Sequence, residues 1–332
     1  MTTETTEPTE PAEPAKPTEP AKPTEAKMTL DKVAGLDAGG SRLAVHGPLV
    51  AVGSDEDVTL WRDLHREATF DSPGAIDRLR FDAGGKEVLA APYALDLGGK
   101  AWTALAKLGP ALIHGLDGPP SGELLVRRAE WSADGQELLV YVEHRQPRGV
   151  ARGGAGAGPQ ARLLWMDRAR HVLAVPWTGQ SFALTSVALG QRWAAAAGTQ
   201  VLVWDRKTRK QVATLEGHTL VVRELAFSVD EQRLASVGND HKVVIVDTAT
   251  WKQVASWDAH DGDAVAVAFH PTRPLLATTG QDGQVRLWSL AGQRLADAAL
   301  GRPGTAVAFS EDGTRLLAVT DDRVVVFAVK AE

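Results

Sequence analysis

The chain of 332 residues contains no cysteine. This absence excludes disulfide bridges, thiol nucleophiles and thiolate-bound metals, and it is typical of proteins in a reducing compartment. Long hydrophobic runs are missing as well, because no stretch approaches the roughly 18 apolar residues that a membrane-spanning helix needs. The first residues lack the basic region and apolar segment of a secretory signal. We therefore expect a cytoplasmic protein with no membrane partner.

Basic charge is also in short supply. Lys and Arg together number 36 against 42 Asp and Glu, which leaves a net charge of −6. A nucleic-acid-binding domain normally carries a basic excess, so we expect no nucleic-acid partner. The sequence has no HExxH zinc motif, no GxSxG elbow and no phosphate-binding P-loop, and its histidines are dispersed. We predict no catalytic residue, no metal and no cofactor.

What the chain does contain is a repeat with a period of about 42 residues. One repeated phrase is an aromatic residue, a turn and an apolar pair, with an apolar residue always seven positions after the aromatic one. Its copies begin at Phe81, Trp131, Phe227, Phe269 and Phe309. A second phrase is a β-branched run that closes on a large residue. It ends at Trp61, Trp102, Trp165, Trp204, Val246, Trp288 and Phe327. A period of about 40–45 residues is typical of the blades of a β-propeller.

The pattern within each copy is one of strands. Residues Ala264–Phe269 alternate alanine and valine, Leu275–Thr279 are almost all apolar, and Gln284–Trp288 alternate polar and apolar side chains. Asp-Gly pairs punctuate these runs, as in tight hairpins. Seven such copies occupy nearly all of the chain after about residue 28. We predict an all-β fold, a seven-bladed β-propeller over residues 28–332.

Two adjacent copies resemble the WD40 repeat family. One copy contains Gly217-His218, Ser236 and Asp240, and the next contains His260, Thr278, Asp282 and Trp288. The resemblance implies that His260, Thr278, Asp282 and Trp288 form a buried hydrogen-bonded tetrad. His218, Ser236 and Asp240 should form one that lacks its tryptophan, because Val246 occupies that place. The resemblance also implies a WD40-type ring that acts as a protein–protein interaction scaffold or adaptor, without catalysis.

The two ends of the chain lead to separate predictions. After the last strand, near residues 323–329, too little chain remains for another strand, so the last blade lacks its outer strand. We predict that residues 28–35 supply this strand and close the ring. Residues 1–27 contain only Met, Thr, Glu, Pro, Ala and Lys, with proline at every third position from 8 to 23. We expect a disordered, stiff spacer; the alternative is a PxxP ligand for a proline-binding groove.

One copy is interrupted by an insertion, residues 145–160, which is rich in glycine and contains Arg145, Arg148 and Arg152 but no acidic residue. A basic loop on a net-acidic protein is a candidate binding arm for a partner protein with an acidic surface. The alternative is a tolerated surface insertion. The sequence leaves open whether the protein is a monomer or a subunit of a hetero-complex.

Aligning the copies also identifies the positions where the innermost strands enter the ring. These positions are Ser41, Asp77, Arg127, Thr185, Arg223, Val265 and Thr305. The charged ones, Arg127, Arg223 and Asp77, are candidate partner-binding residues; the alternative is that they are ordinary surface residues. Two rival functions remain, a propeller enzyme and a small-ligand sensor, each with its site at the central channel. An enzyme would need carboxylates or histidines at the channel mouth, whereas the predicted inward positions are mostly alanine and valine.

Overall fold

The computed structural model describes residues 28–37, 42–54, 56–73, 76, 79–82, 84–90, 93–104, 123–132, 137–145, 160–167, 172–180, 184–190 and 192–331. Every regular element in this part of the chain is a β-strand. The same residues include no helix that is long and apolar enough to cross a membrane.

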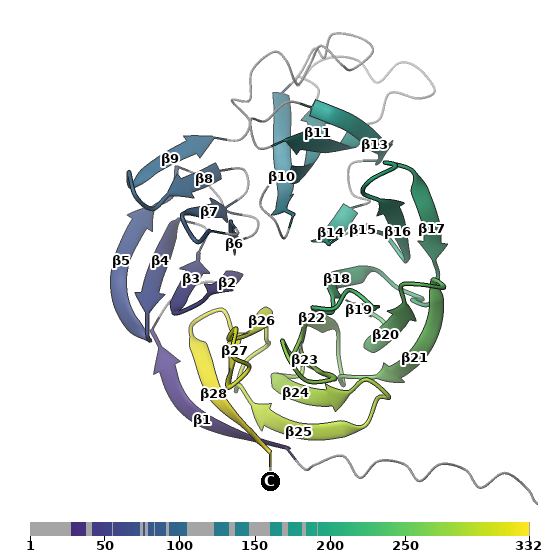
Figure 1. Ribbon diagram of the computed structural model, residues 1–332. Helices are drawn as coiled ribbons and strands as arrows, with labels where there is room; N and C mark the ends of the chain where they lie inside the picture. The colour runs from purple at the N-terminus through teal and green to yellow at the C-terminus, as the bar shows by residue number, and fades with distance from the viewer. Residues whose placement is uncertain are drawn as a thin grey trace, which may run out of the picture.

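The described strands form seven four-stranded sheets, which stand side by side around an open centre (Figure 1). The fold is an all-β propeller, as the repeat predicts. Each sheet is a meander that starts at the centre and runs outward. The first three sheets are β2 (Arg42–His46), β3 (Leu49–Gly53), β4 (Asp57–Arg62) and β5 (His65–Asp71); β6 (Leu79–Phe81), β7 (Glu87–Ala90), β8 (Tyr93–Asp96) and β9 (Ala101–Ala104); β10 (Glu123–Trp131), β11 (Glu137–Arg145), β12 (Gln160–Asp167) and β13 (Val172–Gln180).

The remaining four sheets follow the same plan. They are β14 (Leu184–Leu189), β15 (Arg192–Ala197), β16 (Gln200–Asp205) and β17 (Gln211–Leu215); β18 (Val222–Phe227), β19 (Arg233–Gly238), β20 (Lys242–Asp247) and β21 (Lys252–Asp258); β22 (Ala264–Phe269), β23 (Leu275–Gly280), β24 (Gln284–Ser289) and β25 (Arg294–Ala299); β26 (Ala306–Phe309), β27 (Arg315–Val319), β28 (Val324–Ala331) and β1 (Met28–Leu36).

The hydrophobic core lies between neighbouring sheets, and the repeated phrases supply it. The apolar residues seven positions after each aromatic one are all buried: Val88, Leu138, Leu234, Leu276 and Leu316. So are most of the large residues that close the second phrase, among them Trp165, Trp204 and Phe327. Burying a side chain of this size stabilises a fold by about 1.5–3 kcal/mol. The period seen in the sequence is therefore the period of the core.

The seventh sheet joins the two ends of the described chain. Strand β1 pairs antiparallel with β28, from Met28 opposite Ala331 to Leu36 opposite Val324. Met28 and Leu36 are both buried. The prediction that residues 28–35 close the ring is confirmed, with the strand one residue longer than expected. The outer edge of β28 is thereby paired rather than exposed.

The third sheet differs from expectation in the length of its strands. The pattern predicts strands at Leu138–Glu143 and Ala161–Trp165, whereas β11 and β12 extend further at both ends. The extension of β11 has a partner, since β10 is equally long and Glu123 pairs with Arg145. Because β10 and β11 both stay extended over this length, their backbone pairing continues into the first residue of the insertion. Residues 146–159 of the insertion lie outside the described residues.

Candidate interaction face and its supporting tetrads

The sixth sheet contains the hydrogen-bonded tetrad that the resemblance implies. His260 Nδ1 lies 2.9 Å from Asp282 Oδ1, and His260 Nε2 lies 2.8 Å from Thr278 Oγ1. Trp288 Nε1 donates to the same Thr278 oxygen over 2.9 Å. Because a carboxylate only accepts, Nδ1 must carry the imidazole proton, and Nε2 then accepts from the Thr278 hydroxyl. The four side chains form one chain of donors and acceptors with a neutral histidine.

Arg286 is a fifth member of this cluster, which the sequence analysis missed. Its side chain is 9% exposed, and its Nη1 donates to Asp282 Oδ2 over 2.7 Å and to the Ala259 carbonyl over 2.6 Å. The carboxylate of Asp282 therefore balances the buried positive charge of Arg286 and also accepts the hydrogen bond from the neutral His260 ring. An arginine between the apolar residues Val285 and Leu287 of β24 is the signal that could have revealed it.

The fifth sheet holds the incomplete counterpart. His218 lies 2.9 Å from Asp240 and 2.8 Å from Ser236, as the resemblance implies. Val244 is opposite Ser236 in the ladder, where Arg286 is opposite Thr278 in the sixth sheet. Val246 takes the place of the tryptophan, and a cavity of about 10 Å³ remains beside it and Ser236. A volume of that size holds about one water molecule.

Burial and hydrogen bonding shift the pKa values of the tetrad groups. Burial would raise the pKa of Asp282, but the amide of Asp261 and the His260 ring bond its carboxylate and hold the pKa below 3.8. The pKa of Asp240 is lowered in the same way, by His218 and the Thr219 amide against burial. Burial lowers the pKa of His260 below 6.5 and outweighs the attraction of Asp282. The cluster is thus set for neutral histidine and ionised aspartate.

These shifts predict acid sensitivity with a defined sign. Because the pKa of His260 is lower in the folded state, the unfolded chain binds the proton more readily, and stability falls as the pH drops below 6.5. The lowered pKa values of Asp240 and Asp282 add a further loss below 3.8. Urea unfolding between pH 8 and pH 2.5 measures both steps. H260N should shrink the upper step and keep the lower one; the rest of the upper step belongs to His270, whose pKa is also lowered by burial. A wild-type protein that grows more stable from pH 7 to pH 5 contradicts the assignment.

The tetrads anchor the loops that lead into the innermost strands. Asp240 Oδ2 accepts from the Thr219 amide over 2.8 Å, and the Asn239 amide donates to the Val221 carbonyl over 2.9 Å. The sixth sheet repeats both bonds one blade further on, from the Asp261 amide to Asp282 Oδ2 and from the Gln281 amide to the Asp263 carbonyl. We call the side of the ring formed by these loops, residues 216–221, 259–263 and 300–305, the tetrad face. Its loops are fixed by buried polar groups.

The innermost strands carry a bulge at the same place in four sheets. The ladder between the first and second strands skips one residue, four positions before the end of the first strand, and the skipped residues are Arg127, Thr185, Arg223 and Val265. These are four of the strand-entry positions identified by alignment. A bulge leaves its extra residue outside the ladder and turns the side chain away from the regular pleat. Positions that differ in chemistry between blades are therefore presented by one repeated backbone feature.

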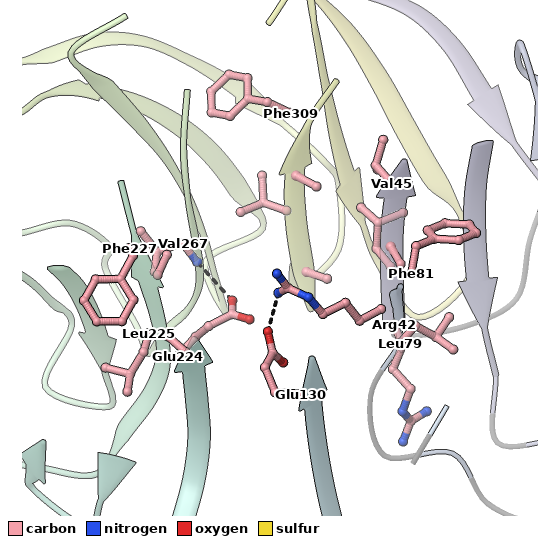
Figure 2. Close-up of a pocket in the computed structure, with 18 of the residues that line it drawn as sticks. Arg42, Val45, Leu79, Phe81, Glu130, Glu224, Leu225, Phe227, Val267 and Phe309 are labelled. Carbon is pink, nitrogen blue, oxygen red and sulfur yellow. Dashed lines mark hydrogen bonds and ion pairs between the residues drawn. The ribbon is translucent and has the colours of Figure 1, made fainter. Parts of the chain in front are cut away.

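The innermost strands surround a channel cavity of about 740 Å³. Thr185, Arg223, Val265 and Thr305 line it at the tetrad face. Inside it, the carboxylates of Glu130 on β10 and Glu224 on β18 turn toward the same space (Figure 2). Glu130 is 3% exposed and forms an ion pair with Arg80. Glu224 accepts a hydrogen bond of 3.1 Å from the Val267 amide on β22, the innermost strand of the next sheet.

This charged lining corrects the expectation of mostly alanine and valine. Alanine does occupy the position before the repeated aromatic residue in three copies, at Ala226, Ala268 and Ala308, but Arg80 and Glu130 take it in two others. Arg42 also lines the cavity. Comparing that single position across the copies could have revealed the ion pair. The pattern of small residues in the best-preserved copies hid the polar ones.

The other predicted binding residues are placed less fully. Arg145 ends β11, while Asp77, Arg148 and Arg152 lie outside the described residues. Of the candidate cations, Arg223 is the one whose side chain is described, and it is exposed at the channel mouth. In the described part of the chain, no three His, Asp or Glu side chains gather as a metal site would require.

A family model described as WD domain, G-beta repeat matches residues 209–247 and 251–289. The chain carries WD40 repeats. Each matched repeat spans the outer strand of one sheet and the three inner strands of the next, β17–β20 and β21–β24. The same offset explains why β1 belongs to the last sheet. No curated protein matches the chain.

Proposed function

We propose that this WD40 protein is a non-catalytic scaffold or adaptor, a seven-bladed ring of the WD40 type throughout, that binds another protein through its tetrad face. The WD40 propeller is a fold commonly used for protein–protein interaction. The observation that carries the proposal is the repeated bulge, which presents Thr185, Arg223 and Val265 at equivalent places around the channel mouth.

The frame behind these residues suits recognition. Loops fixed by hydrogen bonds to Asp240 and Asp282 need little further ordering when a partner binds, so less of the contact energy is lost to entropy. Specificity then resides in side chains that differ from blade to blade on a common scaffold. We place the protein in the cytoplasm, as a monomer or as a subunit of a hetero-complex.

A second candidate is a sensor that binds a small polar ligand in the channel. The observation that favours it is the cavity itself, whose wall contains Glu130, Glu224 and Arg80. Such a ligand would compete with the contacts that these side chains already make, the Arg80–Glu130 ion pair and the bond from Glu224 to the next sheet. For this reason the protein-binding function is the stronger proposal.

Photo-cross-linking tests the proposal directly. A benzoylphenylalanine at Val265 or Thr305 samples the tetrad face, and one at Val229, in the β18–β19 turn, samples the opposite face. We expect one protein from native lysate to be captured from Val265 and Thr305 and not from Val229. Chains without residues 146–159 or 1–27 then show whether the insertion or the N-terminal segment contributes. Capture from Val229 alone, or no capture from the tetrad face, would contradict the proposal, and depletion of a metabolite by the pure protein would favour catalysis instead.

A further inference from the structure

The loop that leads into β18 exposes two apolar side chains, two and three residues before Arg223. Leu220 is 52% exposed and Val221 is 36% exposed. Counting from the tetrad histidines, the equivalent residues in the sixth sheet are Gly262 and Asp263. Neither Leu220 nor Val221 belongs to a core cluster of the described residues.

The loop does not need these side chains to fold. This loop and its equivalent in the sixth sheet are held by the same two hydrogen bonds. In each, the amide after the histidine donates to the tetrad aspartate, and an amide of the turn after the second strand donates to the carbonyl of Val221 or Asp263. The sixth sheet builds this arrangement with glycine and aspartate. Exposed leucine and valine in its place are not explained by packing within the described part of the chain.

The charge next to this apolar pair is positive and available. Arg223 is exposed, and within the described part of the chain its guanidinium has no hydrogen bond or ion pair. The Arg80 guanidinium is already paired with Glu130, and Glu224 bonds the Val267 amide. Among the described residues that line the channel at the tetrad face, Arg223 is therefore a cation that can pair with a carboxylate of a ligand.

We propose that Leu220, Val221 and Arg223, here called the rim site, bind an acidic peptide segment of a partner protein. A carboxylate of the segment pairs with the Arg223 guanidinium, and an apolar side chain a few residues away covers Leu220 and Val221. The rim site rests on the proposed function of the tetrad face and adds the chemistry of the partner. Guanidinium pairs with a carboxylate through two parallel hydrogen bonds, so an aspartate or glutamate is fixed in orientation as well as in charge.

Selection of random dodecapeptides displayed on phage against the full chain tests this proposal. The expected peptides combine Asp or Glu with a large apolar residue. Their dissociation constants, measured by fluorescence anisotropy, should rise at least tenfold in R223V, which introduces the residue of the sixth sheet. They should rise as much in the uncharged double variant L220G/V221S. V229D, on the opposite face, serves as the matched control and should bind like the wild type, and all variants should keep the wild-type melting temperature.

Enrichment of basic peptides, absence of any enrichment, or acidic peptides that bind both rim variants normally would each overturn the rim site. Failure of the underlying function looks different. A partner that cross-links from Val265 but is indifferent to the rim variants leaves the interaction function standing and removes the rim site. If nothing cross-links from Val265 or Thr305, the interaction function itself fails.

Discussion

The D282A variant is expected to lose about 3–5 kcal/mol of unfolding free energy. Asp282 holds four partners at once, because it accepts from His260, from Arg286 and from the amides of Asp261 and Gln284. Without the carboxylate, the buried Arg286 guanidinium keeps only a contact of 3.5 Å with the exposed Asp261 as a counter-ion, and the histidine ring loses the group that fixes its proton. An uncompensated buried charge costs much more than a lost neutral hydrogen bond.

The fifth sheet supplies the matched control. D240A removes the equivalent aspartate where Val244 stands in place of Arg286, so only hydrogen bonds are lost. Its expected cost is about 1–3 kcal/mol. Adding R286V to D282A should recover much of the difference, and urea denaturation of the four combinations gives the coupling between the two side chains. Equal losses in D240A and D282A, with no recovery by R286V, would contradict the role given to the arginine.

Removal of residues 1–36 is expected to destroy cooperative folding or to lower the unfolding free energy by about 5 kcal/mol or more. The deletion removes β1, with its buried Met28 and Leu36, and leaves β28 with one unpaired edge. That edge carries the apolar run Val324, Val325 and Val326. An unpaired apolar strand invites pairing with other chains, so aggregation on heating should accompany the loss.

Removal of residues 1–27 is the control for this truncation, because β1 stays intact. Its melting temperature should match that of the full chain. A synthetic peptide of residues 28–37, added to the shorter chain, should restore part of the lost stability. If the chain that begins at residue 37 melts cooperatively at the temperature of the full chain, ring closure by β1 contributes little and the assignment of its energetic role is wrong.

The sequence predicts the propeller because its core repeats. Leu234, Leu276 and Leu316 recur at one period, and each is buried in the hydrophobic cluster between its own sheet and a neighbouring sheet. The closing strand follows from counting, since the last repeat has no chain left for its outer strand. The geometry of His260 and Asp282 follows from the resemblance. These features are local patterns that repeat, which a single sequence can display.

The features that were missed depend on pairing register and on differences between copies. Arg286 reaches Asp282 because the two are on one hairpin, at a distance that spacing alone does not reveal. The bulge at Arg223 is defined by the pairing of β18 with β19, so the sequence of β18 alone does not predict it. From the sequence, Leu220 looks like any other apolar residue, and only the structure shows that its side chain is exposed. The residues of the proposed binding sites lie where the repeat is broken, and a search for the repeat passes over such places.

The pairing of Met28 with Ala331 has a mechanical consequence. Both ends of the ring leave from one point on its outer circumference, at the strand farthest from the channel (Figure 1). A polypeptide joined next to Met28 or Ala331, such as a fused domain or a surface linker, therefore meets the ring at its outer circumference. The channel and the tetrad face stay clear of this attachment point. Tags, immobilisation and fusion partners placed at either terminus should leave binding through the tetrad face unimpeded.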